Sequence, residues 1–66
     1  MSDALLQQVL DACRQRGCQL IIRPLGDRYR AIADPASDWQ RMFSGVGGAV
    51  DDALADLLAA MHDEEG

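Results

Sequence analysis

Residues 49–63 read AVDDALADLLAAMHD and have the spacing of an amphipathic helix. Asp51 and Asp52 stand near its beginning, where the helix dipole favours negative charge. Apolar residues recur three or four positions apart and form one stripe: Val50, Ala53, Leu54, Leu57, Leu58 and Met61. We therefore expect a closing helix over about residues 49–63 that buries this stripe against the rest of the chain.

The region before this helix predicts a second helix and three short strands. Residues 3–16 have helical apolar spacing, Ser2 is a natural N-cap, and Gly17 can take the left-handed conformation that ends a helix. The segments rich in strand-forming residues are 18–23, 28–33 and 39–44. Between them we expect turns, because Pro24 cannot donate to a strand ladder and Gly45-Val46-Gly47-Gly48 frees the backbone.

The alternation in residues 28–33 assigns the two faces of the sheet. Tyr29, Ala31 and Ala33 point one way, and Arg28, Arg30 and Ile32 point the other way. The alanines leave room for helices, so we predict one α+β domain over residues 1–66. Its order is α-β-β-β-α, a three-stranded antiparallel sheet with both helices packed on one face. The other face would collect Arg23, Arg28, Arg30, Arg41 and Trp39.

Composition and charge limit the functions that the chain can have. It has 66 residues and a net charge of −5, and a chain this short buries only about 60% of its unfolded surface, so dimerisation would help its core. All six cations are arginines within residues 14–41, whereas residues 42–66 carry six acids and no base. No apolar run approaches the roughly 20 residues of a membrane span. We expect a cytoplasmic protein that does not bind membranes.

No catalytic or metal-binding constellation is evident in the sequence. Cys13 and Cys18 have no second Cys or His pair beside them, so we interpret both as small buried hydrophobic residues rather than as a disulfide. His62 lacks catalytic partners, and Asp51, Asp52 and Asp56 lack the spacing of a calcium loop. We therefore expect no enzymatic activity, no cofactor and no metal ion.

The order of elements and the stretch from Gly45-Val46-Gly47-Gly48 through Ala53-Leu54 to Leu58 resemble two families. One is the double-stranded RNA-binding domain, and the other is the HicB-type antitoxins together with many small phage and prophage proteins. The resemblance implies the α-β-β-β-α fold. Double-stranded RNA-binding domains place lysines at the start of the last helix, whereas this chain has Asp51 and Asp52 there and no lysine. That difference disfavours phosphate binding at this helix.

Two surfaces are candidates for binding a partner. The first is the sheet face with Arg23, Arg28, Arg30, Trp39 and Arg41. The second is the acidic face of the last helix, where Ala55 and Ala59 permit close packing beside Asp51, Asp52 and Asp56. Arginine and tryptophan are enriched at interface hot spots, although a solvated sheet face is the simpler interpretation.

The leading hypothesis is a small protein-binding module, of the kind that phages and prophages encode to inhibit a host protein, for example an anti-CRISPR. One alternative is a nucleic-acid-binding regulator that uses the arginines and Trp39. The other is an antitoxin-like half of a two-protein unit. The expected partner is another protein, with a homodimer as a further possibility and nucleic acid disfavoured.

Overall fold

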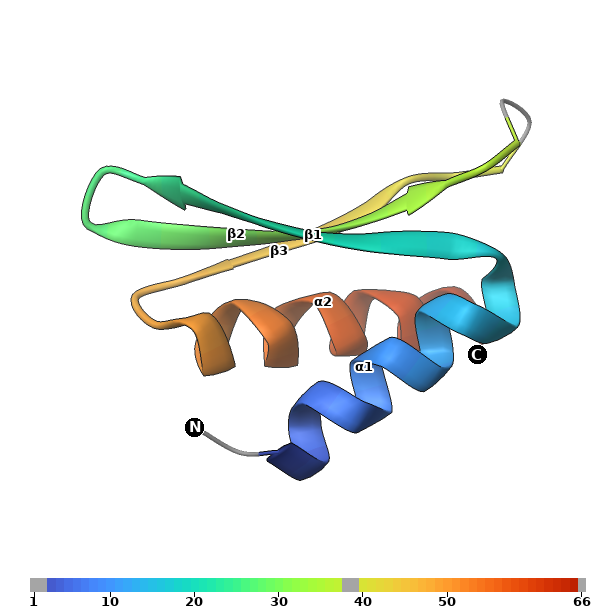
Figure 1. The fold of residues 1–66 in the computed structure, drawn as a ribbon, viewed down its shortest axis with the longest axis horizontal. Helices are drawn as coiled ribbons and strands as arrows, with labels where there is room; N and C mark the ends of the chain where they lie inside the picture. The colour runs from blue at the N-terminus through green and yellow to red at the C-terminus, as the bar shows by residue number, and fades with distance from the viewer. Residues whose placement is uncertain (1–2, 38–39, 66) are drawn as a thin grey trace.

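The computed structural model describes residues 3–37 and 40–65, with side chains described as far as residue 63. Its elements are α1 (Asp3–Arg16), β1 (Cys18–Leu25), β2 (Arg28–Pro35), β3 (Phe43–Gly47) and α2 (Val50–Glu65). The strands form one antiparallel sheet in the order β1-β2-β3. Both helices lie on the same side of the sheet (Figure 1). The predicted α+β fold, with its α-β-β-β-α order, is confirmed.

The hairpin between β1 and β2 is longer than predicted. β1 continues through Pro24 to Leu25, and Gly26-Asp27 alone makes the turn. Gly26 has a φ of 62°, and a glycine at the first position of a two-residue loop is typical of a type II′ turn. Pro24 is tolerated because its nitrogen faces the free edge of β1, where no ladder bond is needed.

The third strand begins and ends later than predicted. It runs from Phe43 to Gly47 rather than over residues 39–44, so Gly45 and Gly47 lie inside a strand and not in a flexible turn. The reason is the approach of α2 to the strand. A Cβ atom at Gly45 would lie 2.6 Å from the Ala53 carbonyl oxygen, and one at Gly47 would lie 2.7 Å from the Ala53 nitrogen. Only glycine fits between β3 and the helix backbone.

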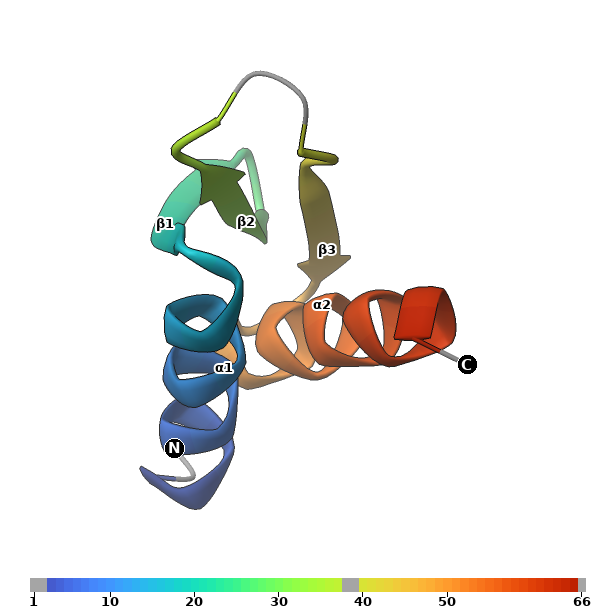
Figure 2. The same ribbon diagram turned by 90° about the vertical axis from the view of Figure 1, so that its right-hand side faces the viewer.

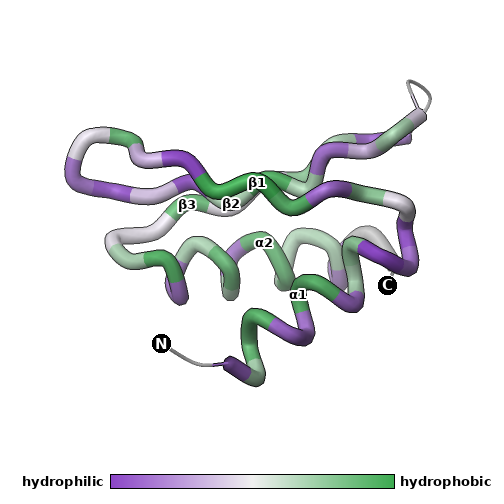
Figure 3. Tube along the Cα trace, viewed as in Figure 1, coloured by the Kyte–Doolittle hydropathy of each residue, from purple (hydrophilic) through white to green (hydrophobic). Residues whose placement is uncertain are grey.

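The core lies between the sheet and the two helices. Ala31 and Ala33 of β2 are fully buried against it, as their predicted facing required. Figure 3 shows apolar segments where β1 passes over the helices, and polar residues at the β1–β2 hairpin end. The buried apolar residues are Val9, Cys13, Ala31, Ala33, Ala53, Leu54, Leu57 and Met61.

Polar contacts connect the carboxyl-terminal ends of the two helices. The Arg16 guanidinium donates a hydrogen bond from Nη2 to the Met61 carbonyl oxygen at 2.9 Å. The Arg16 carbonyl in turn accepts a hydrogen bond from Gln40 Nε2 at 3.1 Å. Arg16 is the last residue of α1, so its carbonyl has no partner within that helix, and the bond from Gln40 satisfies it. The two hydrogen bonds hold α1 against α2 and the segment before β3 against α1.

The cysteines are both free thiols. Cys13 is buried in the core, as interpreted from the sequence, whereas Cys18 is only half-buried. Burial raises the pKa of the Cys13 thiol, the neighbouring Cys18 adds to that effect, and Arg16 opposes it. The neutral thiol is a poor nucleophile, so Cys13 acts as a small core residue.

In the part of the chain that the structure describes, neither helix is long and apolar enough to cross a membrane.

Replacing Gly45 by alanine should destabilise the fold. The added Cβ would meet the backbone of α2, which cannot rotate away as a side chain could, and overpacking of this kind costs about 1–3 kcal/mol. Gly48→Ala is the matched control, because a Cβ atom there has no other atom within 4 Å. Urea unfolding of the two variants measures the difference. Equal stability of Gly45→Ala and the wild type would contradict the packing of β3 on α2.

Candidate functional site

No helix or strand in the described ranges covers the face of the sheet that points away from the helices (Figure 2). The two hydrogen-bonded registers place its residues in rows across the strands. Ile21, Ile32 and Ser44 form one row, and Leu25 lies opposite Arg28 in another. We call this surface the open face, and its residues are Gln19, Ile21, Arg23, Leu25, Arg28, Arg30, Ile32, Asp34, Ser44 and Val46.

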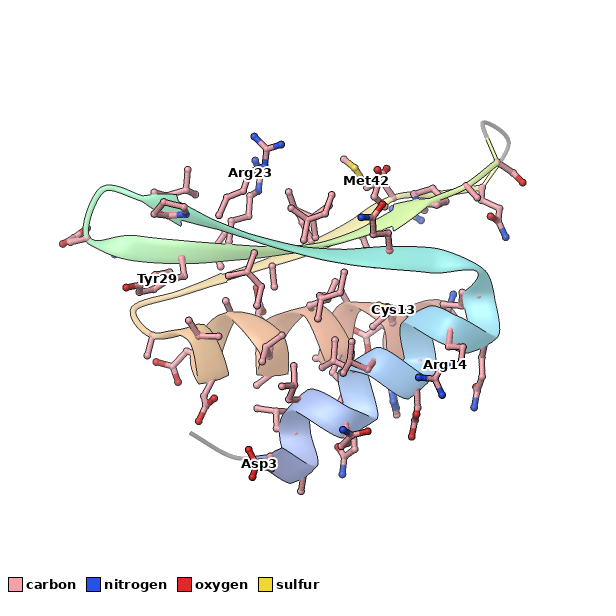
Figure 4. All side chains as sticks on the ribbon, viewed as in Figure 1. Asp3, Cys13, Arg14, Arg23, Tyr29 and Met42 are labelled. Atoms are coloured by element: carbon pink, nitrogen blue, oxygen red, sulfur yellow. The ribbon has the colours of Figure 1, made fainter. Side chains whose placement is uncertain are left out.

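Three arginines of the open face lie close together near the hairpin. Arg23 and Arg30 are directly opposite each other in the β1–β2 ladder, and Arg28 lies on the same face two residues before Arg30. Figure 4 shows Arg23 on the side of the sheet away from the helices. None of the three forms an ion pair with a residue in the described ranges. Like charges directly opposite in a sheet are destabilising, so the fold alone does not account for this pair.

Aliphatic side chains lie beside these arginines. Leu25 is 46% exposed and Val46 is 38% exposed, and Val46 is the β3 partner of Arg30 in the ladder. Ile21 and Ile32 form a half-buried pair in the next row. The open face therefore combines a cationic cluster with an apolar row, a composition that suits a protein interface.

The aromatic residues that the structure describes lie on the other side of the sheet. Phe43 pairs with the buried Ala33, and Tyr29 pairs with Gly47, whose missing Cβ allows α2 to approach. Aromatic rings are what single-stranded nucleic acids stack on. Among its described residues, the open face provides aliphatic groups and guanidinium groups instead.

Arg41 does not belong to the open face as the sequence predicted. It precedes β3, and its guanidinium carbon lies 5.7 Å from the centre of the Phe43 ring. The guanidinium carbon of Arg16 lies 5.3 Å from the centre of the same ring. The prediction was wrong because the start of β3 was placed four residues too early, which put Arg41 inside the strand. Trp39, the remaining member of the predicted face, lies outside the described residues.

The residues of the predicted acidic face of α2 lie in different environments. The Asp56 carboxylate accepts a hydrogen bond from the Val46 backbone nitrogen at 3.0 Å, so it holds the edge of β3. Asp51 is half-buried and Asp52 is exposed at the start of the helix. Ala55 and Ala59 are both exposed and line a shallow hollow between α1 and α2, together with Leu5, Leu58, His62 and Asp63.

Comparison with known proteins gave no match to a family model, to a curated protein or to a solved structure. In the part of the chain that is described, no three histidine, cysteine or acidic side chains lie together as a metal site would require. The absence of enzymatic activity and of a cofactor stays a prediction.

Two features were missed by the sequence reasoning. The role of Asp56 was missed because it depends on the register of β3, and the sequence assigned Val46 to a turn. The facing of Arg23 and Arg30 was foreseen, but not their direct opposition. That opposition follows once the loop is fixed at Gly26-Asp27, and the glycine–aspartate pair was the signal for it.

Reversing one charge of the opposed pair should stabilise the fold. Arg23→Glu places a carboxylate directly across from Arg30, and an opposite-charge pair in a sheet contributes roughly 0.2–1 kcal/mol. Arg23→Gln removes the repulsion without adding attraction and should lie between the wild type and Arg23→Glu. Urea unfolding at low and high salt measures both effects, which salt should reduce. A loss of stability in both variants would show that Arg23 supports the fold in some other way.

Removing the Asp56 carboxylate should weaken the attachment of β3 to α2. Asp56→Ala leaves the Val46 nitrogen without its charged acceptor, and we expect a loss of about 1 kcal/mol because the bond is exposed to water. Asp56→Asn is the control, since it removes the same charge but keeps a side-chain oxygen that can accept the hydrogen bond from the Val46 nitrogen. Chemical denaturation of both variants distinguishes a specific bond from a general effect of charge. Equal effects would argue for the general one.

Proposed function

We propose that this chain is a protein-binding module whose open face binds an acidic surface of another protein. The observation that carries the proposal is the placement of Arg23, Arg28 and Arg30 on an uncovered sheet face, without a described carboxylate partner. The repulsion between Arg23 and Arg30 has no benefit in the isolated domain. Carboxylates of a partner that lie across both guanidinium groups would offset this repulsion with their own attraction to each arginine.

The chemistry of the neighbouring residues supports a protein partner. Arginine forms paired hydrogen bonds with carboxylates and is enriched at interface hot spots. Ile21, Ile32, Leu25 and Val46 provide apolar area beside the charges, and burying it stabilises a complex by about 25 cal/mol per Å² before the costs of association. The expected partner surface is therefore acidic with an apolar centre.

Nucleic acid is the second candidate, because the same three arginines could contact phosphates. The described aromatic residues face the helices, the net charge of the chain is −5, and Asp51 and Asp52 lie where the resembled RNA-binding family has lysines. Long-range attraction to a polyanion is therefore weak. These observations favour the protein partner.

Three expectations from the sequence stay predictions within this proposal. They are the phage or prophage origin, the inhibition of a host protein, and the antitoxin-like alternative. The genes beside this one test the first and the third, because phage genes would support the phage or prophage origin and an adjacent toxin gene would support the antitoxin-like alternative. The cytoplasmic location also stays a prediction.

A pull-down from host lysate with matched variants tests the proposed surface. We expect the wild type and Arg14→Ala to recover the same stoichiometric protein, and Arg23→Ala/Arg30→Ala to lose it at least tenfold, since each charged contact is worth about 1.5–3 kcal/mol. Arg14 is the control because its exposed side chain lies on α1, where it pairs with Asp11.

Two results would contradict the proposal. One is the recovery of no stoichiometric protein, or recovery that does not depend on Arg23 and Arg30. The other is salt-sensitive binding to RNA or DNA that Arg28→Ala and Arg30→Ala abolish, which would support the nucleic-acid regulator instead.

A further inference from the structure

The two edges of the sheet are protected to different degrees. At the β3 edge, α2 packs along the strand and the Asp56 carboxylate accepts a hydrogen bond from the Val46 nitrogen. At the β1 edge, none of the described helices and strands lies beyond the strand (Figure 2). An edge strand with free backbone groups is a template for another strand, and proteins normally block such edges with charges, prolines, bulges or covering segments.

The hairpin register shows which backbone groups point outward from β1. Leu25 and Arg28 close a two-residue loop, so they form a hydrogen-bonded pair, and such pairs alternate with non-hydrogen-bonded ones along an antiparallel ladder. The N–H and C=O groups of Arg23, Ile21 and Gln19 therefore face β2. Those of Ile22, Leu20 and Cys18 point out from the edge. Pro24 also points outward but has no N–H to offer.

The outward-facing stretch lacks the usual protective residues. Residues 18–22 read CQLII and carry no charge, and Pro24 blocks only the far end of the strand. Ile22 is on the helix-facing side of β1, yet it is 39% exposed and is not part of the core cluster. An uncharged edge strand next to an exposed aliphatic side chain can pair with a strand of another chain.

We propose that β1 pairs with β1 of a second copy of this chain, antiparallel and with the two-fold axis at Leu20. In this register Leu20 lies opposite Leu20 of the second copy, and Cys18 lies opposite Ile22 of the second copy. Cys18, Leu20 and Ile22, whose backbone groups point outward, then each find a partner, and Pro24 lies beyond the paired stretch. The Cys18, Leu20 and Ile22 side chains extend the apolar layer beneath the sheet across the interface.

The distribution of charge favours pairing of the two β1 edges over two other contacts between copies, one through the open faces and one through the outer sides of α2. Open face against open face would bring together two sets of Arg23, Arg28 and Arg30. The outer side of α2 against itself would oppose two sets of Asp52, Asp56 and Asp63. The paired stretch of β1 contains no charge, and Arg23 would lie opposite Gly17 of the second copy. A small domain with a marginal core also gains apolar burial from such a dimer.

The resulting dimer has one continuous six-stranded sheet. Because the two-fold axis is perpendicular to the sheet, the helices of both copies lie on one side and both open faces lie on the other. This inference does not depend on the proposed function, since it concerns backbone groups at the edge and not the arginines of the open face.

Amide hydrogen exchange and sedimentation of the whole chain test the proposal together. We expect the mass of two 7.2 kDa chains, and amides of Leu20 and Ile22 that exchange at least roughly tenfold more slowly at high than at low protein concentration. The amides of Ile21 and Arg23 bond to β2 and should be protected at both concentrations. A monomer at all concentrations, or a dimer in which Leu20 and Ile22 exchange freely, would overturn the proposal.

Two variants test the edge and the register. Ile22→Pro removes an outward N–H without removing a bond to β2, and it should give a monomer with an unchanged circular dichroism spectrum, whereas Ile22→Val should remain a dimer. With oxidised glutathione added as the two-electron oxidant, Ile22→Cys in a Cys13→Ala background should form a disulfide with Cys18 of the second copy, because opposed residues of a hydrogen-bonded pair have Cα atoms about 5.5 Å apart.

Ile21→Cys in the same background is the control for the disulfide, since its side chain points to the other face of the sheet. A persistent dimer in Ile22→Pro, or equal cross-linking by both cysteine variants, would show that the copies meet elsewhere. If Ile22→Pro does not fold, the exchange rates of the wild-type amides still decide the question.

Discussion

The backbone contact between β3 and α2 is the constraint on which the rest of the structure depends. Gly45 and Gly47 let the strand lie directly on the helix, at a distance that leaves no room for a side chain. That contact fixes the start of β3, and through the ladder it fixes which residues of β2 face the helices. Ala31 and Ala33 continue the same close packing one strand further, so a chain with few large apolar residues still forms a buried core.

Close packing at β3 also explains why the two sides of the molecule differ in character. The helices approach the sheet so closely that all the fully buried residues lie in one layer between them. Nothing is left in the described part of the chain to cover the second face. The molecule therefore has two layers and not three, and the residues on the uncovered face are free to bind a partner.

The sequence predicted the fold well where regular apolar spacing extends over several turns, and poorly where a glycine could serve either of two structural roles. Both helices were placed within two residues of their observed ends because their apolar spacing extends over several turns. The facing of residues 28–33 was also correct, because alternation fixes it. The third strand was misplaced because Gly45 and Gly47 were interpreted as turn residues, although here they permit close approach. The residues next to these glycines do not distinguish the two uses, since the contacts that require glycine are made with Asp52, Ala53, Asp56 and Leu57 of α2, five to twelve positions later.

Each residue of the candidate site was placed as accurately as the strand that carries it. Arg23, Arg28 and Arg30 were placed correctly because they lie in the hairpin, whereas Arg41 was misplaced together with β3. Asp56 was assigned to a binding surface and instead holds β3, a contact that could be recognised only once Val46 was known to be an edge residue.

The alternation of the strands separates the residues that make the fold from those that make the surface. Along β2, Ala31 and Ala33 face the core, while Arg28, Arg30 and Ile32 alternate with them and face outward. The open face can therefore change while the core stays the same, and the cost of such a change is set by contacts within the sheet, such as the opposed Arg23 and Arg30.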